Sequence, residues 1–210
     1  MLVLPDYHGL TSYYERLSVR IAERGIDTIA IDYYGRTAET AERNASFEHL
    51  RHHQQTTWAG LQNDVAAALA ELRSKRPTTS LFSMGFCFGG RVSFLLASSP
   101  DLAMAGVIGF YGWPVGPFGS DIPAPAEVAA DFRAPLLGIF GGADAKISRQ
   151  DVEVFEGALT AAAVEHRLVT YEDAPHSFFD HQQRSHADAS RRAWSEVETF
   201  VAAISGAAGP

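Results

Sequence analysis

Three residues of this chain have types and an order that could carry out covalent catalysis: Cys87, Asp144 and His176. A thiolate attacks carbonyl carbon, an imidazole accepts the thiol proton, and a carboxylate holds the imidazole in the required tautomer. Cys87 is the only cysteine of the chain. The order nucleophile, acid, histidine along the chain, with each residue following a predicted strand, predicts a catalytic triad.

The stretch 85–90, Gly-Phe-Cys-Phe-Gly-Gly, surrounds the candidate nucleophile. It follows an apolar run at 80–84 that predicts a buried strand, and a predicted helix over 88–98 comes after it. A sharp turn between the two, with small neighbours that let the chain fold back, is typical of a nucleophile elbow. We expect the helix N-terminus to lower the pKa of Cys87. The alternative is that Cys87 is a small buried apolar side chain.

The acid and the base are predicted from their places after two later strands. Asp144 comes after the apolar run 136–140 and a glycine-rich turn, at the sheet edge where ligands gather in open α/β sheets. A turn or helix-capping role is the alternative for this aspartate. His176 lies in a loop between the predicted strand 167–171 and the last helix, and that position distinguishes it from the other seven histidines.

Two backbone N–H groups are candidates for an oxyanion hole, which stabilises the charge on a tetrahedral intermediate. Phe88 stands at the start of the helix that follows Cys87. Tyr7 lies in the loop after the first predicted strand. With these donors, Cys87 is expected to attack the carbonyl of an ester or lactone.

Alternating strands and helices predict an α/β fold with a mostly parallel sheet covered by helices on both faces. We expect a single domain over 1–210, with no repeat or linker. Its first core strand begins almost at Met1, so the strands that usually precede it are expected to be missing. The segments 36–56 and 111–135 are expected to cover the active-site face. The predicted strands are 2–4, 28–31, 80–84, 106–110, 136–140 and 167–171, and the predicted helices are 12–24, 57–73, 88–98, 149–162 and 185–204.

Composition restricts the partners. The net charge of -8 argues against nucleic acid, and no apolar run is long enough to span a membrane. A single cysteine and the absence of signal-peptide features indicate a protein of the reducing cytoplasm. The histidines at 49, 52 and 53 fit no metal-ligand pattern, so no metal is expected. For the oligomeric state, both a monomer and a homodimer are compatible with the sequence.

These motifs resemble the dienelactone hydrolase family over nearly the whole chain. The resemblance rests on the stretches 85–90, Gly-Gly-Ala-Asp at 141–144 and Pro-His-Ser-Phe-Phe at 175–179, with further matches at 31–36 and 109–112. It implies an α/β-hydrolase fold and a cofactor-free cysteine hydrolase with a Cys-Asp-His triad, acting on cyclic or enol-type esters. Asp6, three positions before Gly9, matches an acidic residue of the family that would hold the thiol proton in the resting enzyme.

The substrate pocket departs from the family pattern. The family's prototype binds an anionic substrate with arginines, one of them four residues after the catalytic histidine, where this chain has Asp180. An acid there would repel a carboxylate. Arg36, Arg43 and Arg51 are candidates for the other arginine. The predicted pocket residues are Arg36, His52, Tyr111, Trp113 and Phe178.

Two other classes of function compete with the hydrolase. Cys87 could be oxidised or otherwise modified in a redox or thiol-handling protein, with Asp6 tuning it. No second cysteine exists to resolve a disulfide within the chain. The chain could also be a binding domain that keeps the elbow without catalysis. The triad order favours the hydrolase over both.

Overall fold

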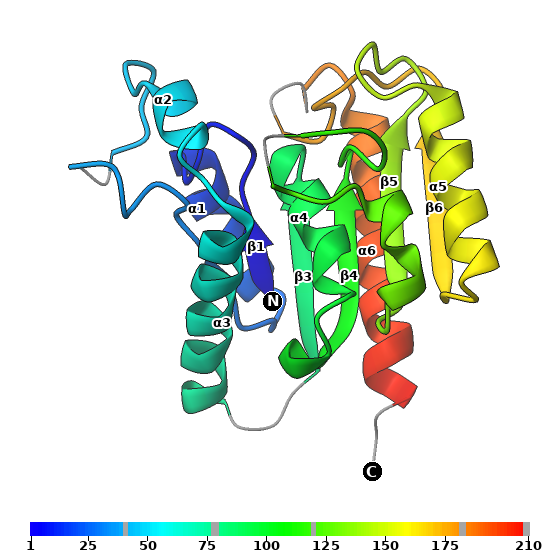
Figure 1. Cartoon of the computed structure of the whole chain (residues 1–210), viewed down its shortest axis with the longest axis horizontal. Helices are drawn as coiled ribbons and strands as arrows, with labels where there is room; N and C mark the ends of the chain where they lie inside the picture. Colours follow the sequence, from blue (N-terminus) through cyan, green and yellow to red (C-terminus); the bar gives the residue numbers. More distant parts are fainter. Residues whose placement is uncertain (40–41, 77–79, 119–120, 181–183, 208–210) are drawn as a thin grey trace.

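A computed structural model describes residues 1–39, 42–76, 80–118, 121–180 and 184–207. Six parallel strands form one sheet in the order β2-β1-β3-β4-β5-β6 (Figure 1). This is the parallel α/β sheet that the sequence predicts. The strands are β1 (Leu2–Leu4), β2 (Ile29–Ala30), β3 (Leu81–Phe86), β4 (Met104–Phe110), β5 (Leu136–Gly141) and β6 (His166–Tyr171).

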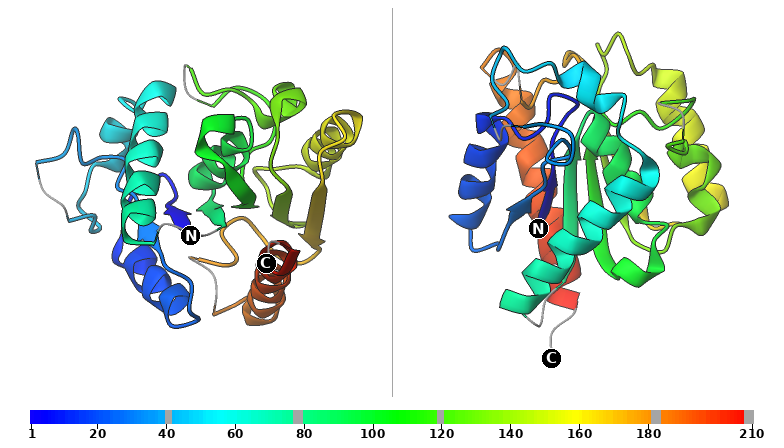
Figure 2. Two further views of the ribbon diagram at one scale, coloured as in Figure 1. Left: turned by 90° about the horizontal axis from the view of Figure 1, so that it is seen from below. Right: turned by 60° about the vertical axis from the view of Figure 1, so that its left-hand side comes forward.

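Helices cover both faces of the sheet. Figure 2 shows α3, α4 and α5 on one face and α1 and α6 on the other. The five long predicted helices are confirmed, with ends that differ from prediction by a few residues. The helices are α1 (Ser12–Ala22), α2 (His49–His53), α3 (Trp58–Lys75), α4 (Phe88–Leu96), α5 (Arg149–Ala161) and α6 (Ala187–Ala207), and short 3₁₀ turns occupy Pro100–Leu102, Pro125–Glu127 and Ala129–Asp131.

The central strands are continuous apolar runs because helices bury them from both sides. Every residue of β3 and of β5 is buried. α4, directly after β3, is also buried along its whole length. α5 begins with a capping box: the Ser148 side chain accepts from the N–H of Asp151, while the Asp151 carboxylate accepts from that of Ser148.

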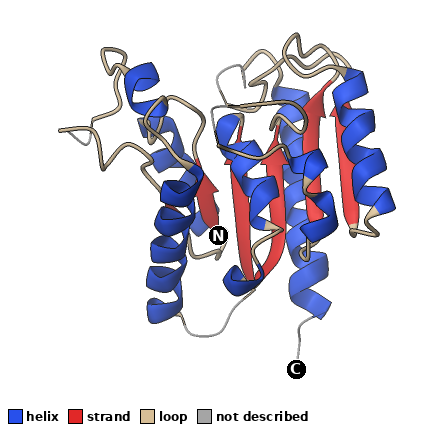
Figure 3. Ribbon diagram, in the orientation of Figure 1, coloured by secondary structure: helices blue, strands red, loops and turns tan. Residues whose placement is uncertain are grey.

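Parallel strands bring their carboxyl ends to one edge, and the loops after β1, β3, β5 and β6 gather there (Figure 3). The segment 111–135 leaves β4 at this same edge, and the segment 36–56 contains the short helix α2. Asp6, Cys87, Asp144 and His176 each follow one of these strands. The topology therefore places residues that are up to 170 positions apart in the chain at one edge of the sheet.

Candidate active site

Cys87 occupies a strained turn between β3 and α4. Its backbone has φ 54° and ψ -113°, in a region that residues with side chains rarely adopt. The turn needs small neighbours: a Cβ on Gly85 would stand 1.9 Å from the carbonyl oxygen of Gly89, and one on Gly89 would stand 2.1 Å from that of Leu4. The N–H of Cys87 donates to the carbonyl of Phe110 at 2.9 Å, which ties the turn to β4.

Asp144 and His176 are in direct contact. Oδ2 of Asp144 lies 2.6 Å from Nδ1 of His176, and both residues are buried. The other carboxylate oxygen accepts from the N–H of Lys146 at 2.7 Å and that of Ile147 at 3.2 Å. These backbone donors fix the carboxylate, and the carboxylate in turn fixes the imidazole ring. The second ring nitrogen, Nε2, lies on the side of the ring away from this carboxylate.

The surroundings of Cys87 favour a neutral thiol. Burial raises the pKa of Cys87 well above its ordinary value, and the negative charge of Asp6 raises it further. The N–H of Phe88 hydrogen-bonds the sulfur and acts in the opposite direction, with a smaller effect. The first N–H of the helix thus lowers the pKa of this thiol as expected, but burial and the neighbouring carboxylate outweigh it, and the net shift is upward.

Asp6 is almost fully buried beside the thiol. Its two carboxylate oxygens lie 2.9 Å from the backbone N and 3.1 Å from Nδ1 of His8. The aromatic ring of Tyr7 packs 4.1 Å from the imidazole of His8 and 5.1 Å from that of His49, so side chains from α2 close this side of the site. Sequence reasoning singled out Asp6 but not its link to His8.

The loop after β1 presents the second predicted oxyanion donor. Gly9, with φ +85°, turns the loop, and its N–H donates to the carbonyl of Asp6 at 3.0 Å. The carbonyl of Tyr7 accepts from the hydroxyl of Tyr34 at 2.6 Å. Within the described residues the N–H of Tyr7 donates no hydrogen bond, as an oxyanion donor requires. Phe88, the other predicted donor, is the first residue of α4.

The five predicted pocket residues lie in two places. The rings of Tyr111 and Trp113 are 5.1 and 5.0 Å from that of His176, and Phe178 packs 5.7 Å from Tyr111. Tyr111 and Trp113 thus pack beside the histidine, and Phe178 packs on Tyr111. Arg36 and His52 instead line a cavity of about 50 Å³ beside Tyr33. There Arg36 forms an ion pair with Asp64, and Nδ1 of His52 lies 2.8 Å from the hydroxyl of Thr37.

The other two candidate arginines are also beside carboxylates. The Arg43 side chain is fully buried and contacts Asp32 at 2.5 Å. Arg51 is exposed and lies 3.9 Å from Glu48. Asp180, by contrast, is buried near the site, where its carboxylate accepts from the hydroxyl of Tyr14 at 3.0 Å and contributes to raising the pKa of Cys87.

Sequence reasoning missed Arg91, a fully buried residue on α4 one turn after Cys87. Its guanidinium donates to the carbonyls of Trp113 at 3.2 Å, Gly116 at 2.9 Å and Ile122 at 3.1 Å. Burial lowers the pKa of Arg91 to about 10, so it stays charged at neutral pH. Arg91 therefore ties the segment that carries Trp113 to α4, the helix that follows Cys87. A lone charge inside an otherwise apolar helix was the available signal.

The sheet order, the elbow and the buried Asp-His pair define an α/β hydrolase. The dienelactone hydrolase family model matches residues 1–205, and the chain belongs to this family. It is thereby a hydrolase of the carboxylic ester and lactone class. None of the helices in the described parts of the chain is long and apolar enough to cross a membrane.

Relatives and solved structures agree with this assignment. A "Putative carboxymethylenebutenolidase" of Salmonella typhimurium is 35% identical over 222 residues, covering 100% of this chain and 78% of the relative. The carboxymethylenebutenolidase of Rhodococcus opacus is 25% identical over 180 residues, which cover 85% of this chain and 69% of the relative. The crystal structure of a "Putative Dienelactone Hydrolase" from Klebsiella pneumoniae has a TM-score of 0.78 at 26% identity, covering 96% of this chain and 85% of that one.

Proposed function

We propose that the protein hydrolyses small carboxylic esters or lactones with Cys87 as nucleophile, His176 as general base and Asp144 as the residue that orients His176. The observation that carries the proposal is the 2.6 Å contact between Asp144 and His176, at the same sheet edge as the strained turn of Cys87. The three groups follow three different strands whose carboxyl ends share this edge, and a capping role for Asp144 alone would not explain its contact with His176.

In the first half of the reaction, Nε2 of His176 takes the thiol proton and the sulfur attacks the carbonyl carbon of the substrate. The negative charge moves to the carbonyl oxygen, where the N–H groups of Phe88 and Tyr7 stabilise it. Each such donor contributes about 3–4 kcal/mol of transition-state stabilisation. When the carbon–oxygen bond breaks, the leaving oxygen takes the proton from His176 and a thioester forms on Cys87.

In the second half, His176 removes a proton from water and the resulting hydroxide attacks the thioester. The tetrahedral intermediate collapses, the carboxylic acid leaves, and the sulfur recovers its proton from His176. In a lactone the leaving oxygen stays attached to the acyl group, so the product is one hydroxy or keto acid. No electron transfer is involved. The thiol proton leaves on the oxygen of the leaving group, and a proton from water replaces it on the sulfur.

Asp6 is proposed to keep the thiol protonated until substrate binds. Its carboxylate is one of the groups that raise the pKa of Cys87. A protonated thiol is a weak nucleophile and reacts slowly with oxidants. The role of Asp6 is therefore to suppress reactions of the empty site.

The charges around the site favour a substrate without a carboxylate near the reacting carbonyl. Asp6 and Asp180 are both buried close to Cys87. Arg36 and Arg43 are each engaged by an aspartate. A neutral lactone or short neutral ester avoids the repulsion that an anion would meet there.

Hydrolysis by the wild type and by Cys87→Ala, over short p-nitrophenyl esters, neutral lactones and a dienelactone, tests the proposal. We expect Cys87→Ala to fold and to lose activity by at least about a thousandfold. We expect kcat/KM of the wild type to rise with pH as the general base loses its proton. A Cys87→Ala variant that keeps its activity would place the nucleophile elsewhere.

The competing redox function makes a different prediction. If Cys87 is a redox or modified thiol, neither protein hydrolyses any of the substrates, and peroxide converts Cys87 to the sulfenic acid at a rate that follows the thiolate population alone. The high pKa of the resting thiol argues against this alternative, because redox-sensing cysteines have low pKa values and are accessible to solvent.

A further inference from the structure

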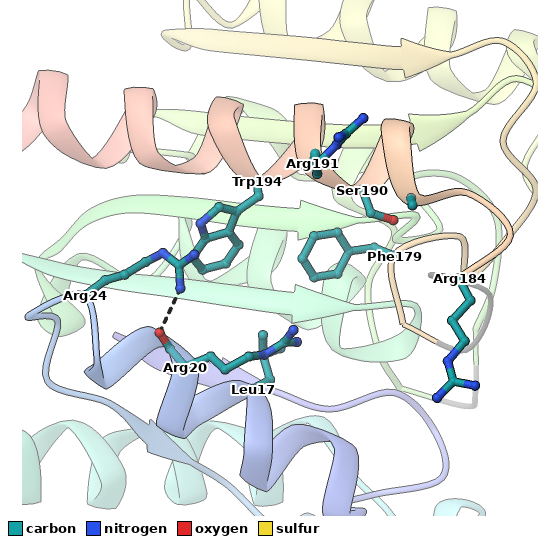
Figure 4. Close-up of a pocket in the computed structure, with 9 residues that line it drawn as sticks. Leu17, Arg20, Arg24, Phe179, Arg184, Ser190, Arg191 and Trp194 are labelled. Atoms are coloured by element: carbon teal, nitrogen blue, oxygen red, sulfur yellow. Dashed lines mark hydrogen bonds between the residues drawn. The ribbon is translucent and has the colours of Figure 1, made fainter.

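A groove of about 410 Å³ lies between α1 and α6, on the face of the sheet opposite α4. Its volume is in the range of small-molecule binding sites. Figure 4 shows the rings of Trp194 and Phe179 between the two helices, with arginine side chains on α1 beside them. Neither Cys87 nor any other proposed catalytic residue lines this groove.

The floor of the groove is apolar. Leu17 and Phe179 are almost fully buried there, and Trp194 is half-buried. The indole N–H of Trp194 donates to Glu198 at 2.7 Å, which fixes the ring. Ser190, also buried, donates to the carbonyl of Phe178 at 3.2 Å. The floor is therefore an ordered surface of rings and aliphatic carbon that accepts an apolar group.

Four arginines line the groove: Arg20, Arg24, Arg184 and Arg191. Two of them are paired, Arg24 with Glu198 at 3.0 Å and Arg191 with Asp188 at 2.7 Å. Arg20, which is half-buried, and Arg184 form no ion pair with any carboxylate of the described residues. The groove thus keeps a positive charge in a protein whose net charge is -8.

We propose that this groove binds an organic carboxylate whose apolar body lies on Trp194 and Phe179 and whose charge is compensated by the guanidinium groups of Arg20 and Arg184, which both line the groove. A guanidinium matches the geometry of a carboxylate and is weakly hydrated, which makes arginine suited to such contacts. A neutral molecule would leave both cations unmatched, and a small inorganic anion would leave the apolar floor uncovered. The proposal does not depend on the chemistry of Cys87.

Octanoate is the probe, and 1-octanol is its uncharged counterpart. Calorimetric titration of the wild-type protein is expected to show saturable binding of octanoate and much weaker binding of octanol. Arg20→Gln together with Arg184→Gln should weaken octanoate binding by at least about tenfold, because two charge-assisted contacts are lost. Arg16→Gln, on α1 but outside the groove, is the matched control and should leave affinity unchanged. Arg184 is exposed, so Arg184→Gln alone tests the charge without risk to folding.

Tryptophan fluorescence locates the bound probe. Trp194 lies in the groove and Trp113 beside His176, so Trp194→Phe should abolish the octanoate response and Trp113→Phe should keep it. That result, with the arginine dependence, supports the proposal. A response that instead disappears in Trp113→Phe would place the carboxylate in the active site and overturn it. Absence of saturable binding, or binding unaffected by either arginine variant, would also overturn it.

Discussion

Asp6 is the residue whose charge and position can be tested most directly. Burial of the thiol and then the Asp6 carboxylate raise the pKa of Cys87. Asp6→Asn removes the charge with little change of volume and should lower that pKa. The pKa of Cys87 is measured by following thiolate absorbance against pH. Because a lower pKa leaves more thiolate at neutral pH, the rate of alkylation of Cys87 should be higher in the variant. Asp173→Asn, at an exposed position, is the control. An unchanged titration would show that Asp6 does not act on the sulfur.

Asp180 makes a separate prediction about specificity. It is a buried carboxylate at the place where the family's prototype has an arginine. Asp180→Asn should raise kcat/KM for an ester that carries a carboxylate relative to the neutral ester of the same shape, by roughly tenfold if a full repulsion of about 1.4 kcal/mol is removed. The ratio of the two kcat/KM values is the measurement, since a general loss of stability would lower both. An unchanged ratio would exclude Asp180 as the source of discrimination.

At the scale of elements, the elbow depends on close approach of backbone to backbone. A Cβ on Gly89 would lie 2.1 Å from the carbonyl oxygen of Leu4, which belongs to β1 and cannot rotate away. Gly89→Ala should therefore lower the free energy of unfolding by at least about 2 kcal/mol. Gly157→Ala, at a helical position with no atom within 4 Å of the new Cβ, should be neutral or stabilising. Urea denaturation compares the two, and equal stabilities would contradict the packing argument.

Arg91 couples the nucleophile helix to the segment that carries Trp113. Arg91→Met fills a similar space but leaves three carbonyls without their donor. We expect a loss of about 3 kcal/mol in stability and faster proteolytic cleavage within 113–122. Arg133→Met, which removes contacts of an exposed arginine with nearby carbonyls, should leave cleavage unchanged. If Arg91→Met is cleaved no faster than the wild type, the conformation of the segment does not depend on Arg91.

At the scale of the whole molecule, buried phenols set the alkaline limit of stability. Burial raises the pKa values of Tyr14, Tyr33 and Tyr111 well above the ordinary value. Above about pH 10 the unfolded chain releases these protons while the folded protein keeps them, so the free energy of unfolding falls as pH rises. Below about pH 10 the three tyrosines are protonated in both states, so their contribution to the free energy of unfolding is fully present. Urea denaturation between about pH 8 and pH 11 measures the decline, and a flat profile would contradict it.

Most of the fold and the core of the site could be predicted from the sequence, because local patterns carry them. Strand runs, the glycine elbow around Cys87 and the loop position of His176 are each visible within about ten residues. The positions of Arg36 and His52 could not be predicted in this way. Their surroundings depend on ion pairs and stacking with residues distant in the chain, such as Asp64. The net pKa of Cys87 could not be predicted in this way either, because its burial and the charge of Asp6 come from other elements.

Phe179 joins the two regions that the sheet otherwise separates. Its ring contacts those of Phe110 at 4.6 Å and Trp194 at 6.3 Å, and it follows His176 by only three residues. A ligand on Trp194 and a transition-state analogue on Cys87 would thus contact opposite ends of the same short loop, 176–179. The two binding affinities are then thermodynamically linked. If the groove ligand changes the affinity for the analogue by some factor, the analogue changes the affinity for the groove ligand by the same factor.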